Sequence, residues 1–398
     1  MSSVCSIFNQ ITALFPRGEF EQAVREHKAE RHARGFRCWS QFVAMLFCQL
    51  TQAQSLREIC HGLACSEGKL RHLGVETAPK RATLAYANEH RPWGLYQTVF
   101  EQLYAKCRGE LDQARERGQG RKRKLRFRRR LMSIDASLVM LLADSFDWVE
   151  YHRGKGAVKL HLALDHEGYL PRFAVISEAN KPEVTVARGW KFPRGMTLLF
   201  DKGFTDYGWF DELSDDGVKF VTRFRRDGVY ETLSERTPPP GSRVRSDRII
   251  RLGAERRVMR NRLRRIEFEP LEGHEEFVLL TNNFRIKAET AAELYGQRWR
   301  IEQFFRLLKQ NLRVKSFVGT SANAVLIQIW TALIAMLLLK YLMLRAQFAW
   351  SFANLLAMLR LQLFVYRDLQ GWLDQPFRAP PTPLALHDEQ LVLPFARA

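Results

Sequence analysis

Hydrophobic residues in the first third of the chain recur every three to four positions, which is the spacing of amphipathic helices. Phe42 and Leu46 follow this spacing, and Ser55 with Glu58 forms a capping box at the start of the next helix. We therefore expect a helical N-terminal domain over residues 1–110. A helix, a turn and a second helix is compatible with recognition of DNA ends, although any small helical bundle has the same pattern.

From Leu131 the pattern changes to alternating and short apolar runs, which are typical of strands, and longer helical segments follow. Strands followed by helices favour a mixed α/β sheet with flanking helices. The rest of the chain divides into further parts. Residues 111–130 are a basic linker, and residues 131–217 with 286–345 are an α/β core in two parts. Residues 218–285 are a separate β-rich insertion, and residues 346–398 are a C-terminal helix with a tail. Long helices are expected from Thr290 to about Arg313 and from Ser351 to about Leu373.

The most apolar stretch, residues 324–339, contains Gln328 and Thr331 and is about the minimum length for a membrane span. We interpret it as a buried core helix; the alternative is a protein of anionic membranes. The six cysteines lie in the first third without a CxxC pair, and the N-terminus has no secretory signal pattern. These features favour the cytoplasm and no membrane partner.

The net charge indicates what the protein binds. The chain carries a net charge of +19, while 46% of its residues are hydrophobic. A folded protein with this excess of positive charge favours polyanionic partners. Eight of the ten residues in 121–130 are basic, and ten arginines lie between Arg243 and Arg265. We expect both segments to bind duplex DNA without sequence preference, with an affinity that falls as salt rises.

Two aspartates interrupt apolar strand segments. Asp135 lies between Ile134 and Ala136, and Asp201 follows an apolar run directly before Lys202. An unpaired carboxylate in such a place costs several kcal/mol, so either a neighbouring Lys or Arg or a divalent cation must compensate it.

A third polar group lies on a predicted helix, where Tyr295, Arg298, Glu302 and Lys309 recur at steps of three and four and so share one face. Glu302 could simply form an exposed ion pair with Arg298 or Arg306. A phenol, two cations and a carboxylate on one face are also typical of a site for a metal-bound phosphate. Lys202 and Trp299 could help to position DNA there.

At this point the chain resembles the DDE transposases of bacterial insertion-sequence family four. Tyr295-x2-Arg298-x3-Glu302-x6-Lys309 matches the family's Y-R-E-K signature, and Asp135 in SIDAS and Asp201 in FDKGF look like its two aspartates. The first hundred residues also resemble the N-terminal domain of unknown function that is common on these transposases.

The resemblance implies a ribonuclease-H-like catalytic core interrupted by the β-rich insertion. It implies that Asp135, Asp201 and Glu302 are catalytic metal ligands. Three carboxylates without a His or Cys cluster select two Mg²⁺ ions, for which Mn²⁺ can substitute. The implied partners are double-stranded DNA, as terminal inverted repeats and as target, and a second copy of the chain when two ends are paired. Glu183 takes the place of a His-Asp pair of the family.

The resemblance further implies that Arg298 and Lys309 clamp phosphates and that Tyr295 donates a hydrogen bond near the bond that is cut. Two alternatives remain open at this point. One is a nuclease on the same core that does not join strands. The other is a non-catalytic DNA-binding or regulatory protein derived from a transposase.

Overall fold

The structure is a computed structural model of the chain. It describes residues 5–31, 33, 35–116, 131–141, 156–238, 240–253, 258–269, 277–314 and 316–377. The basic run at 121–130 therefore lies outside the described residues.

Short helices form the N-terminal third, as the apolar spacing predicts. Ser6 and Ser55 cap two of them with side-chain hydrogen bonds to backbone N–H groups. The helices are α1 (Ile7–Thr12), α2 (Arg17–Glu26), α3 (Cys38–Thr51), α4 (Leu56–Ala64), α5 (Glu67–Leu70), the 3₁₀ turn η1 (Arg71–Leu73), α6 (Arg81–His90) and α7 (Gly94–Glu116).

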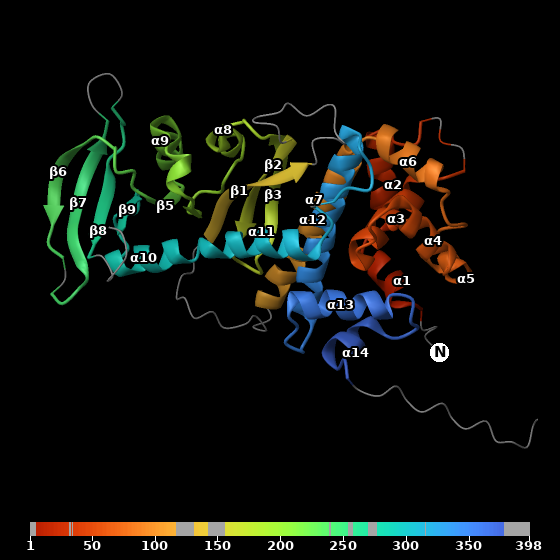
Figure 1. Cartoon of the computed structure of the whole chain (residues 1–398). Helices are drawn as coiled ribbons and strands as arrows, with labels where there is room; N and C mark the ends of the chain where they lie inside the picture. Colours follow the sequence, from red (N-terminus) through yellow and green to blue (C-terminus); the bar gives the residue numbers. More distant parts are fainter. Residues whose placement is uncertain are drawn as a thin grey trace, which may run out of the picture.

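A mixed sheet of nine strands runs through the rest of the described chain in the order β3-β2-β1-β4-β5-β9-β8-β7-β6 (Figure 1). The strands β1, β2 and β3 are antiparallel neighbours, whereas β4 pairs in parallel with both β1 and β5. This 3-2-1-4-5 order is the ribonuclease-H-like core. The strand bounds are Leu131–Leu141, Gly156–Asp165, Leu170–Glu178, Thr197–Leu199, Lys219–Arg223, Tyr230–Arg236, Val244–Leu252, Leu263–Phe268 and Phe277–Thr281 for β1 to β9.

Helices cover both faces of this sheet. On one face α8 (Glu183–Arg188), η3 (Lys202–Phe204) and α9 (Tyr207–Asp215) pack over Met132, Ile134 and Phe220. On the other face α10 (Ala288–Gly296) packs over Leu131 and Leu199, and α11 (Trp299–Asn311) continues along β1. Because side chains alternate along a strand, each strand supplies both layers.

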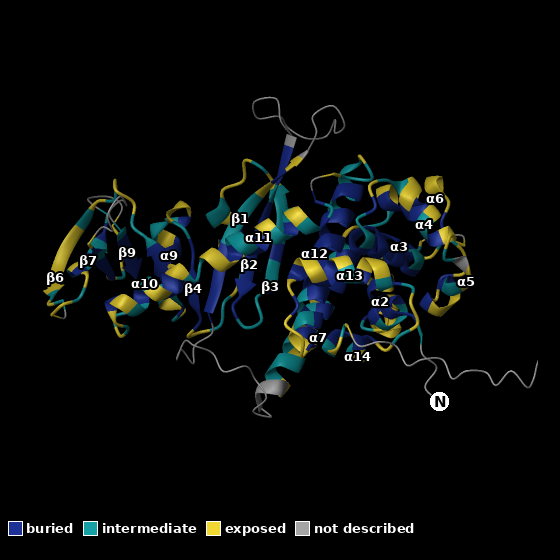
Figure 2. Ribbon diagram, turned by 60° about the horizontal axis from the view of Figure 1, so that its bottom comes forward, coloured by how far each residue is buried: buried dark blue, intermediate teal, exposed yellow. Residues whose placement is uncertain are grey.

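The apolar helix α12 (Ala322–Arg345) is buried between the N-terminal helices and the sheet, as expected for a core helix (Figure 2). It contacts α3, α6 and α7 on one side and β3 on the other. By length and composition it is the one described helix that could cross a membrane, but its apolar surface is covered by protein. α13 (Phe352–Gln362) and α14 (Leu369–Asp374) complete this core.

Three expectations differ from the structure. The β-rich segment is not a separate sheet, because β5 pairs with β4 of the core and β9 pairs with β5. The predicted helix from Thr290 to Arg313 is broken between α10 and α11, and the one from Ser351 to Leu373 is broken between α13 and α14. Periodicity shows which face is apolar, but it does not detect a turn that leaves this face unchanged.

Candidate active site

Asp135 lies in the middle of β1, on the face that α10 and α11 cover. Its neighbours Ile134 and Met132 point to the opposite face and are buried there. The Asp135 side chain is 20% exposed, and its Oδ1 accepts a hydrogen bond of 2.9 Å from the Ala136 N–H. The strand thus holds a carboxylate among apolar residues at the border of the core.

Asp201 lies two residues after the end of β4 and beside Asp135 by register. The last parallel pair between the two strands is Ser133 with Leu199, and each aspartate lies two residues further along its own strand. A step of two keeps a side chain on the same face. Asp201 and Asp135 therefore lie on the same face of neighbouring strands, and Tyr295 donates its hydroxyl to Asp201 Oδ1 at 3.2 Å.

The helix tightens between α10 and α11. The N–H groups of Gln297, Arg298 and Ile301 donate to carbonyls three residues back, as in a 3₁₀ turn. Tyr295 ends up on the α10 side of this turn and Glu302 on the α11 side. Arg298 lies between them, with its guanidinium 5.6 Å from the centre of the Tyr295 ring.

Arg298 connects the carboxylates. Its Nη2 donates to Glu302 Oε1 at 2.6 Å, and its Nη1 lies 3.8 Å from Asp135 Oδ2. The ion pair between Arg298 and Glu302 that the sequence allowed is present, but the guanidinium also reaches the sheet. Asp201, Tyr295, Arg298, Asp135 and Glu302 therefore form one connected group.

Lys309 is held against β1 two turns further along α11. Its Nζ donates to Ser137 Oγ at 2.8 Å and to the Leu138 carbonyl at 2.7 Å. Ser137 is two residues beyond Asp135 and on the same face of β1. Ser137 was not among the residues predicted from the sequence. It lies two residues after Asp135, and the two-residue repeat of a strand would have indicated it.

Lys202 and Trp299 lie at the edge of this group. Lys202 is exposed in η3, immediately after Asp201. The Trp299 side chain is 47% exposed, and the Arg306 guanidinium lies 5.4 Å from the centre of its ring. Both side chains are therefore accessible to a large ligand that approaches the carboxylates.

Burial and neighbouring charges shift two pKa values here. Burial raises the pKa of Asp135 to about 6; Glu183 and Glu302 add to this rise, while the Ala136 N–H and Arg298 oppose it. Burial also raises the pKa of Tyr295 to about 12, and the charge of Asp201 contributes. Tyr295 therefore remains a hydrogen-bond donor at neutral pH.

Glu183 is a fourth carboxylate near the group. It is the first residue of α8, and its Oε1 lies 3.7 Å from Lys159 Nζ on β2. A Cβ added to Gly203, two residues after Asp201, would lie 3.9 Å from Glu183 Oε2. Glu183 thus lies close to the turn after Asp201 and within electrostatic range of Asp135.

The donor chemistry of this group fits a hard divalent cation, because every acidic ligand supplies carboxylate oxygens. Within the described ranges no three acidic, His or Cys side chains already converge as a metal-binding set. Arg298 lies between Asp135 and Glu302 instead, 2.6 Å from Glu302 Oε1 and 3.8 Å from Asp135 Oδ2. The residues that could hold a cation are Asp135, Asp201 and Glu302.

Comparison with known proteins decides the family. The family described as "Transposase DDE domain" matches residues 114–338, and a domain of unknown function, DUF4372, matches residues 4–76. The chain belongs to the DDE transposases. The match contains all three carboxylates and the Y-R-E-K residues, and the domain of unknown function matches the N-terminal helices.

Relatives of this transposase carry the same description. A putative transposase, y4zB, of Sinorhizobium fredii is 30% identical over 66% of this chain and 71% of its own length. A probable transposase for an insertion-sequence element of Geobacillus stearothermophilus is 28% identical over 66% of this chain and 67% of its own length. Among solved structures, a piggyBac transposase synaptic complex with hairpin DNA gives a TM-score of 0.46 at 10% identity, covering 96% of this chain and 84% of that one.

Proposed function

We propose that this transposase cuts the ends of an insertion sequence and joins them to target DNA at Asp135, Asp201 and Glu302. In the proposed reaction, water first attacks the phosphodiester at the element end and leaves a free 3′-hydroxyl. That hydroxyl then attacks a phosphodiester of the target, and the target's 3′-oxygen leaves. The observation that carries the proposal is the connection of all three carboxylates through Tyr295 and Arg298.

Asp135, Asp201 and Glu302 would hold two Mg²⁺ ions, or Mn²⁺ in their place. Two such ions activate the attacking oxygen and stabilise the leaving oxygen of an in-line displacement at phosphorus. Carboxylates on a strand, a strand end and a helix supply hard oxygen ligands from separate elements, which leaves one side open to DNA.

Arg298 is suited to bind a phosphate. Its Nε is buried, and no partner for it lies in the described part of the chain. A phosphate oxygen would satisfy this donor and would compete with Glu302 for the guanidinium. Tyr295, protonated at neutral pH, can donate to a second oxygen, and Lys309 can hold the strand further along β1. Lys202 and Trp299 can contact DNA at the edge.

The decisive experiment uses Asp135→Ala and Glu302→Ala in strand-cleavage and strand-transfer assays with Mg²⁺. The ends are the inverted repeats that flank the gene. Cleavage should fall by at least about a thousandfold in both variants, while binding of the ends stays within a few-fold. Arg300→Ala, which removes an exposed cation of the same helix that contacts Gln303 and Tyr169, is the matched control and should cleave normally. Cleavage near the wild-type rate in either carboxylate variant would contradict the proposal.

The N-terminal helices are our candidate for recognition of the ends, because base contacts rather than phosphate contacts specify sequence. The helix-turn-helix of α3 and α4 leaves Arg57 and His61 exposed on the second helix. Pairing two ends requires two active sites, so we propose a homodimer on DNA in the bacterial cytoplasm. Joining of a cleaved end to a second duplex separates a transposase from a nuclease on the same core.

A further inference from the structure

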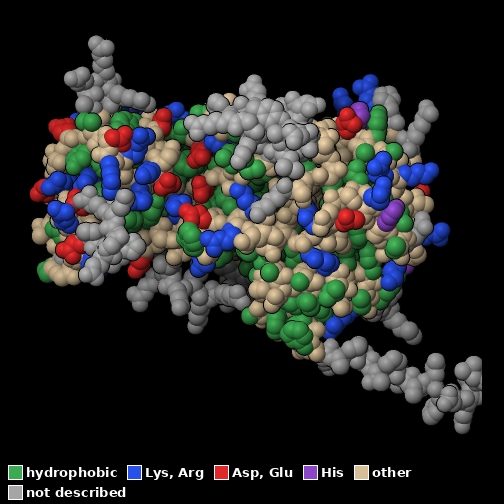
Figure 3. Space-filling view, in the orientation of Figure 1, with side chains coloured by type: hydrophobic (Ala, Val, Ile, Leu, Met, Phe, Trp, Pro, Cys, Tyr) green, Lys and Arg blue, Asp and Glu red, His purple; other side chains and the backbone are tan. Residues whose placement is uncertain are grey.

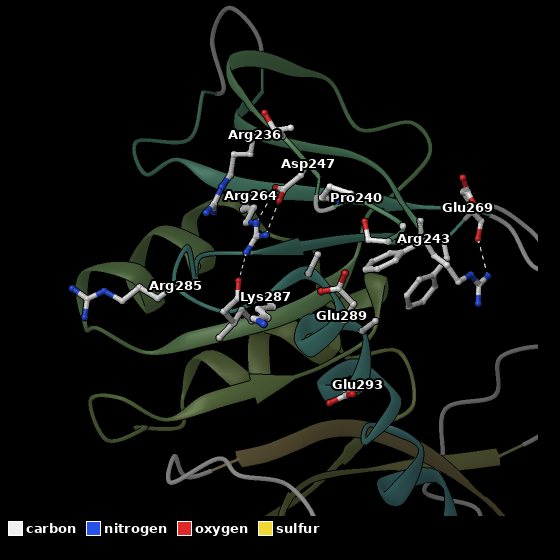
Figure 4. Close-up of a pocket in the computed structure, with 18 of the residues that line it drawn as sticks. Arg236, Pro240, Arg243, Asp247, Arg264, Glu269, Arg285, Lys287, Glu289 and Glu293 are labelled. Atoms are coloured by element: carbon white, nitrogen blue, oxygen red, sulfur yellow. Dashed lines mark hydrogen bonds and ion pairs between the residues drawn. The ribbon is translucent and has the colours of Figure 1, made fainter.

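A large cavity lies between the β6–β9 part of the sheet and α10 (Figure 4). Its volume is about 1270 Å³, which is larger than most small-molecule sites. The buried pair of Arg264 and Asp247, joined at 2.6 and 2.8 Å, forms part of its wall. The cavity is on the α10 face of the sheet, which is the face that carries Asp135 and Asp201.

Apart from Arg264, the cations on the wall of this cavity have no acidic partner among the described residues. Arg236 donates to the Phe284 carbonyl and Arg243 to the Glu269 carbonyl, both of which are neutral groups. Over the part of the chain that the structure describes, five cations on this wall form no ion pair: Arg223, Arg236, Arg243, Arg285 and Lys287. Three of them, Arg236, Arg285 and Lys287, lie on the same side of the cavity, and the Arg285 side chain extends outward from it (Figure 4).

The opposite, α9 face of the sheet is different, because its arginines are paired. Arg225 lies 3.0 Å from Asp227, Arg260 2.8 Å from Asp215, and Arg188 3.0 Å from Glu212. Basic and acidic side chains are interspersed over this end of the molecule, so composition alone does not single out a face (Figure 3). The α10 face is distinguished instead by five cations that form no ion pair with another described residue, although acids line the same cavity.

One wall of the cavity adjoins the active site. Phe277 on its wall lies 5.8 Å from the Tyr295 ring, and the Tyr295 hydroxyl donates to Asp201. Lys287 precedes Tyr295 by eight residues, so it lies about 12 Å away along the helix, or about three to four base pairs of B-DNA. Arg285 also lines a second hollow of about 500 Å³, together with Arg194 and Lys219.

We infer that this side of the cavity binds the phosphate backbone of the DNA duplex that extends from the active site. The inference rests on the proposed function and adds to it the face and the residues that hold the duplex. Arg236, Arg285 and Lys287 neutralise successive phosphates three or more base pairs from the bond that is cut.

The contacts are to phosphates rather than to bases. Phe268 is only 8% exposed, and Phe277 packs against Phe268 and Tyr295, so neither ring is free to stack on a base. Three acids also line the cavity; Glu289 and Glu293 lie one turn apart on α10, and Glu269 lies beside Arg243. They keep the backbone on the side where the three cations lie.

The test compares two double variants of the full chain. R285A/K287A removes two unpaired exposed cations from the α10 face, and R225A/R260A removes two paired exposed arginines from the α9 face. The probe is a labelled random-sequence duplex of about 30 base pairs in EDTA, with affinity measured from low to moderate salt. The slope of log Kd against log salt should fall by up to about 1.8 in R285A/K287A. It should stay at the wild-type value in R225A/R260A.

Equal slopes in R285A/K287A and wild type would overturn the inference, as would an equal loss in both variants. Loss of binding to polyglutamate with unchanged duplex binding would assign the face to an acidic protein and would also overturn it. The proposed function fails separately: a wild-type protein that binds duplex with this salt dependence but cuts nothing with Mg²⁺ contradicts only the catalytic proposal.

Discussion

Asp135 is held in a place that is unfavourable for its charge. Burial raises its pKa to about 6, and Arg298 only partly opposes this. A raised carboxyl pKa means that the folded state binds the proton more tightly than the unfolded state does. Above pH 6 the folded protein therefore carries this ionised group at a cost in stability.

Replacing this group should therefore stabilise the protein. We expect Asp135→Asn to raise the free energy of unfolding by about 1–3 kcal/mol at pH 7.5, because the amide removes the cost of the buried charge. At pH 4, where the wild-type Asp135 is protonated in the folded state, the difference should nearly vanish. Thermal unfolding in EDTA at both pH values measures it. A variant less stable than wild type at pH 7.5 would show that Asp135 is stabilising when charged.

Glu183 should contribute to the acid limit of the reaction. Its negative charge raises the pKa of Asp135, so Glu183→Gln should lower that pKa. The acid limb of the pH profile of cleavage should then move to lower pH by less than about one unit. Glu178→Gln, an exposed acid at the end of β3, is the control. An unmoved limb in Glu183→Gln, or an equal shift in the control, would contradict this role.

The sequence predicted most of these residues because their spacing is local. Steps of three and four place Tyr295, Arg298 and Glu302 on one face of a helix whatever the fold is. Whether that helix face lies next to Asp135 depends on the topology of the fold. The spacing of residues along the chain does not contain this information. The unpaired cations around Lys287 were hidden for the same reason, since ion pairing depends on which acids the fold brings near.

At the level of elements, buried polar side chains fix how α12 is seated. Gln328 has no exposed surface, and its amide bonds the Val318 N–H and the carbonyls of Arg313 and Ser316. In the sequence, the polar Gln328 argues against a membrane helix. The structure gives the physical reason. This amide forms hydrogen bonds with three backbone groups of the segment that connects α11 to α12.

Gln328→Leu should thus destabilise the protein more than an ordinary core change. It removes the side-chain partner of three part-buried backbone groups, and an unsatisfied buried group costs about 1–3 kcal/mol, so we expect a loss of about 2–5 kcal/mol. Thr331→Val is the control one turn away, since the Thr331 hydroxyl bonds only to the Ile327 carbonyl of its own helix. Thermal unfolding of both variants provides the measurement, and equal midpoints would contradict the role of Gln328.

The elements themselves were predictable where the periodicity was strong, as for α3, α12 and the strand of Asp135. Their boundaries at Gln297 and near Leu363 were not, because the apolar face continues across each turn. The joining of the β-rich segment to the core sheet was also missed. Strands pair through backbone hydrogen bonds. The residue types of β5 therefore do not indicate that it pairs with β4 and β9.

At the level of the whole molecule, the N-terminal helices and the catalytic part share one hydrophobic core. Phe42, Leu46 and Leu50 of α3 belong to the same buried cluster as Leu333 of α12 and Leu355 of α13. Gln49 of α3 accepts a hydrogen bond from the Arg313 N–H and donates one to the Gln328 carbonyl of α12. Gln52, directly after α3, donates to the Asn311 carbonyl at the end of α11. The expected helical domain at 1–110 is therefore helical, but it is packed as part of the whole.

This arrangement predicts how a truncated chain will behave. A chain without residues 1–110 would expose the face of α12 that α3, α6 and α7 cover. Because large exposed apolar surfaces drive association, we expect this chain to aggregate, whereas the full chain stays soluble. Size-exclusion chromatography and circular dichroism of both chains test this. A monodisperse truncated chain with cooperative unfolding would mean that the N-terminal helices are an independent domain. Recognition of the ends should therefore be tested in the full chain. Arg57→Ala changes an exposed side chain of α4, so it should reduce the preference for the ends and leave the shared core intact.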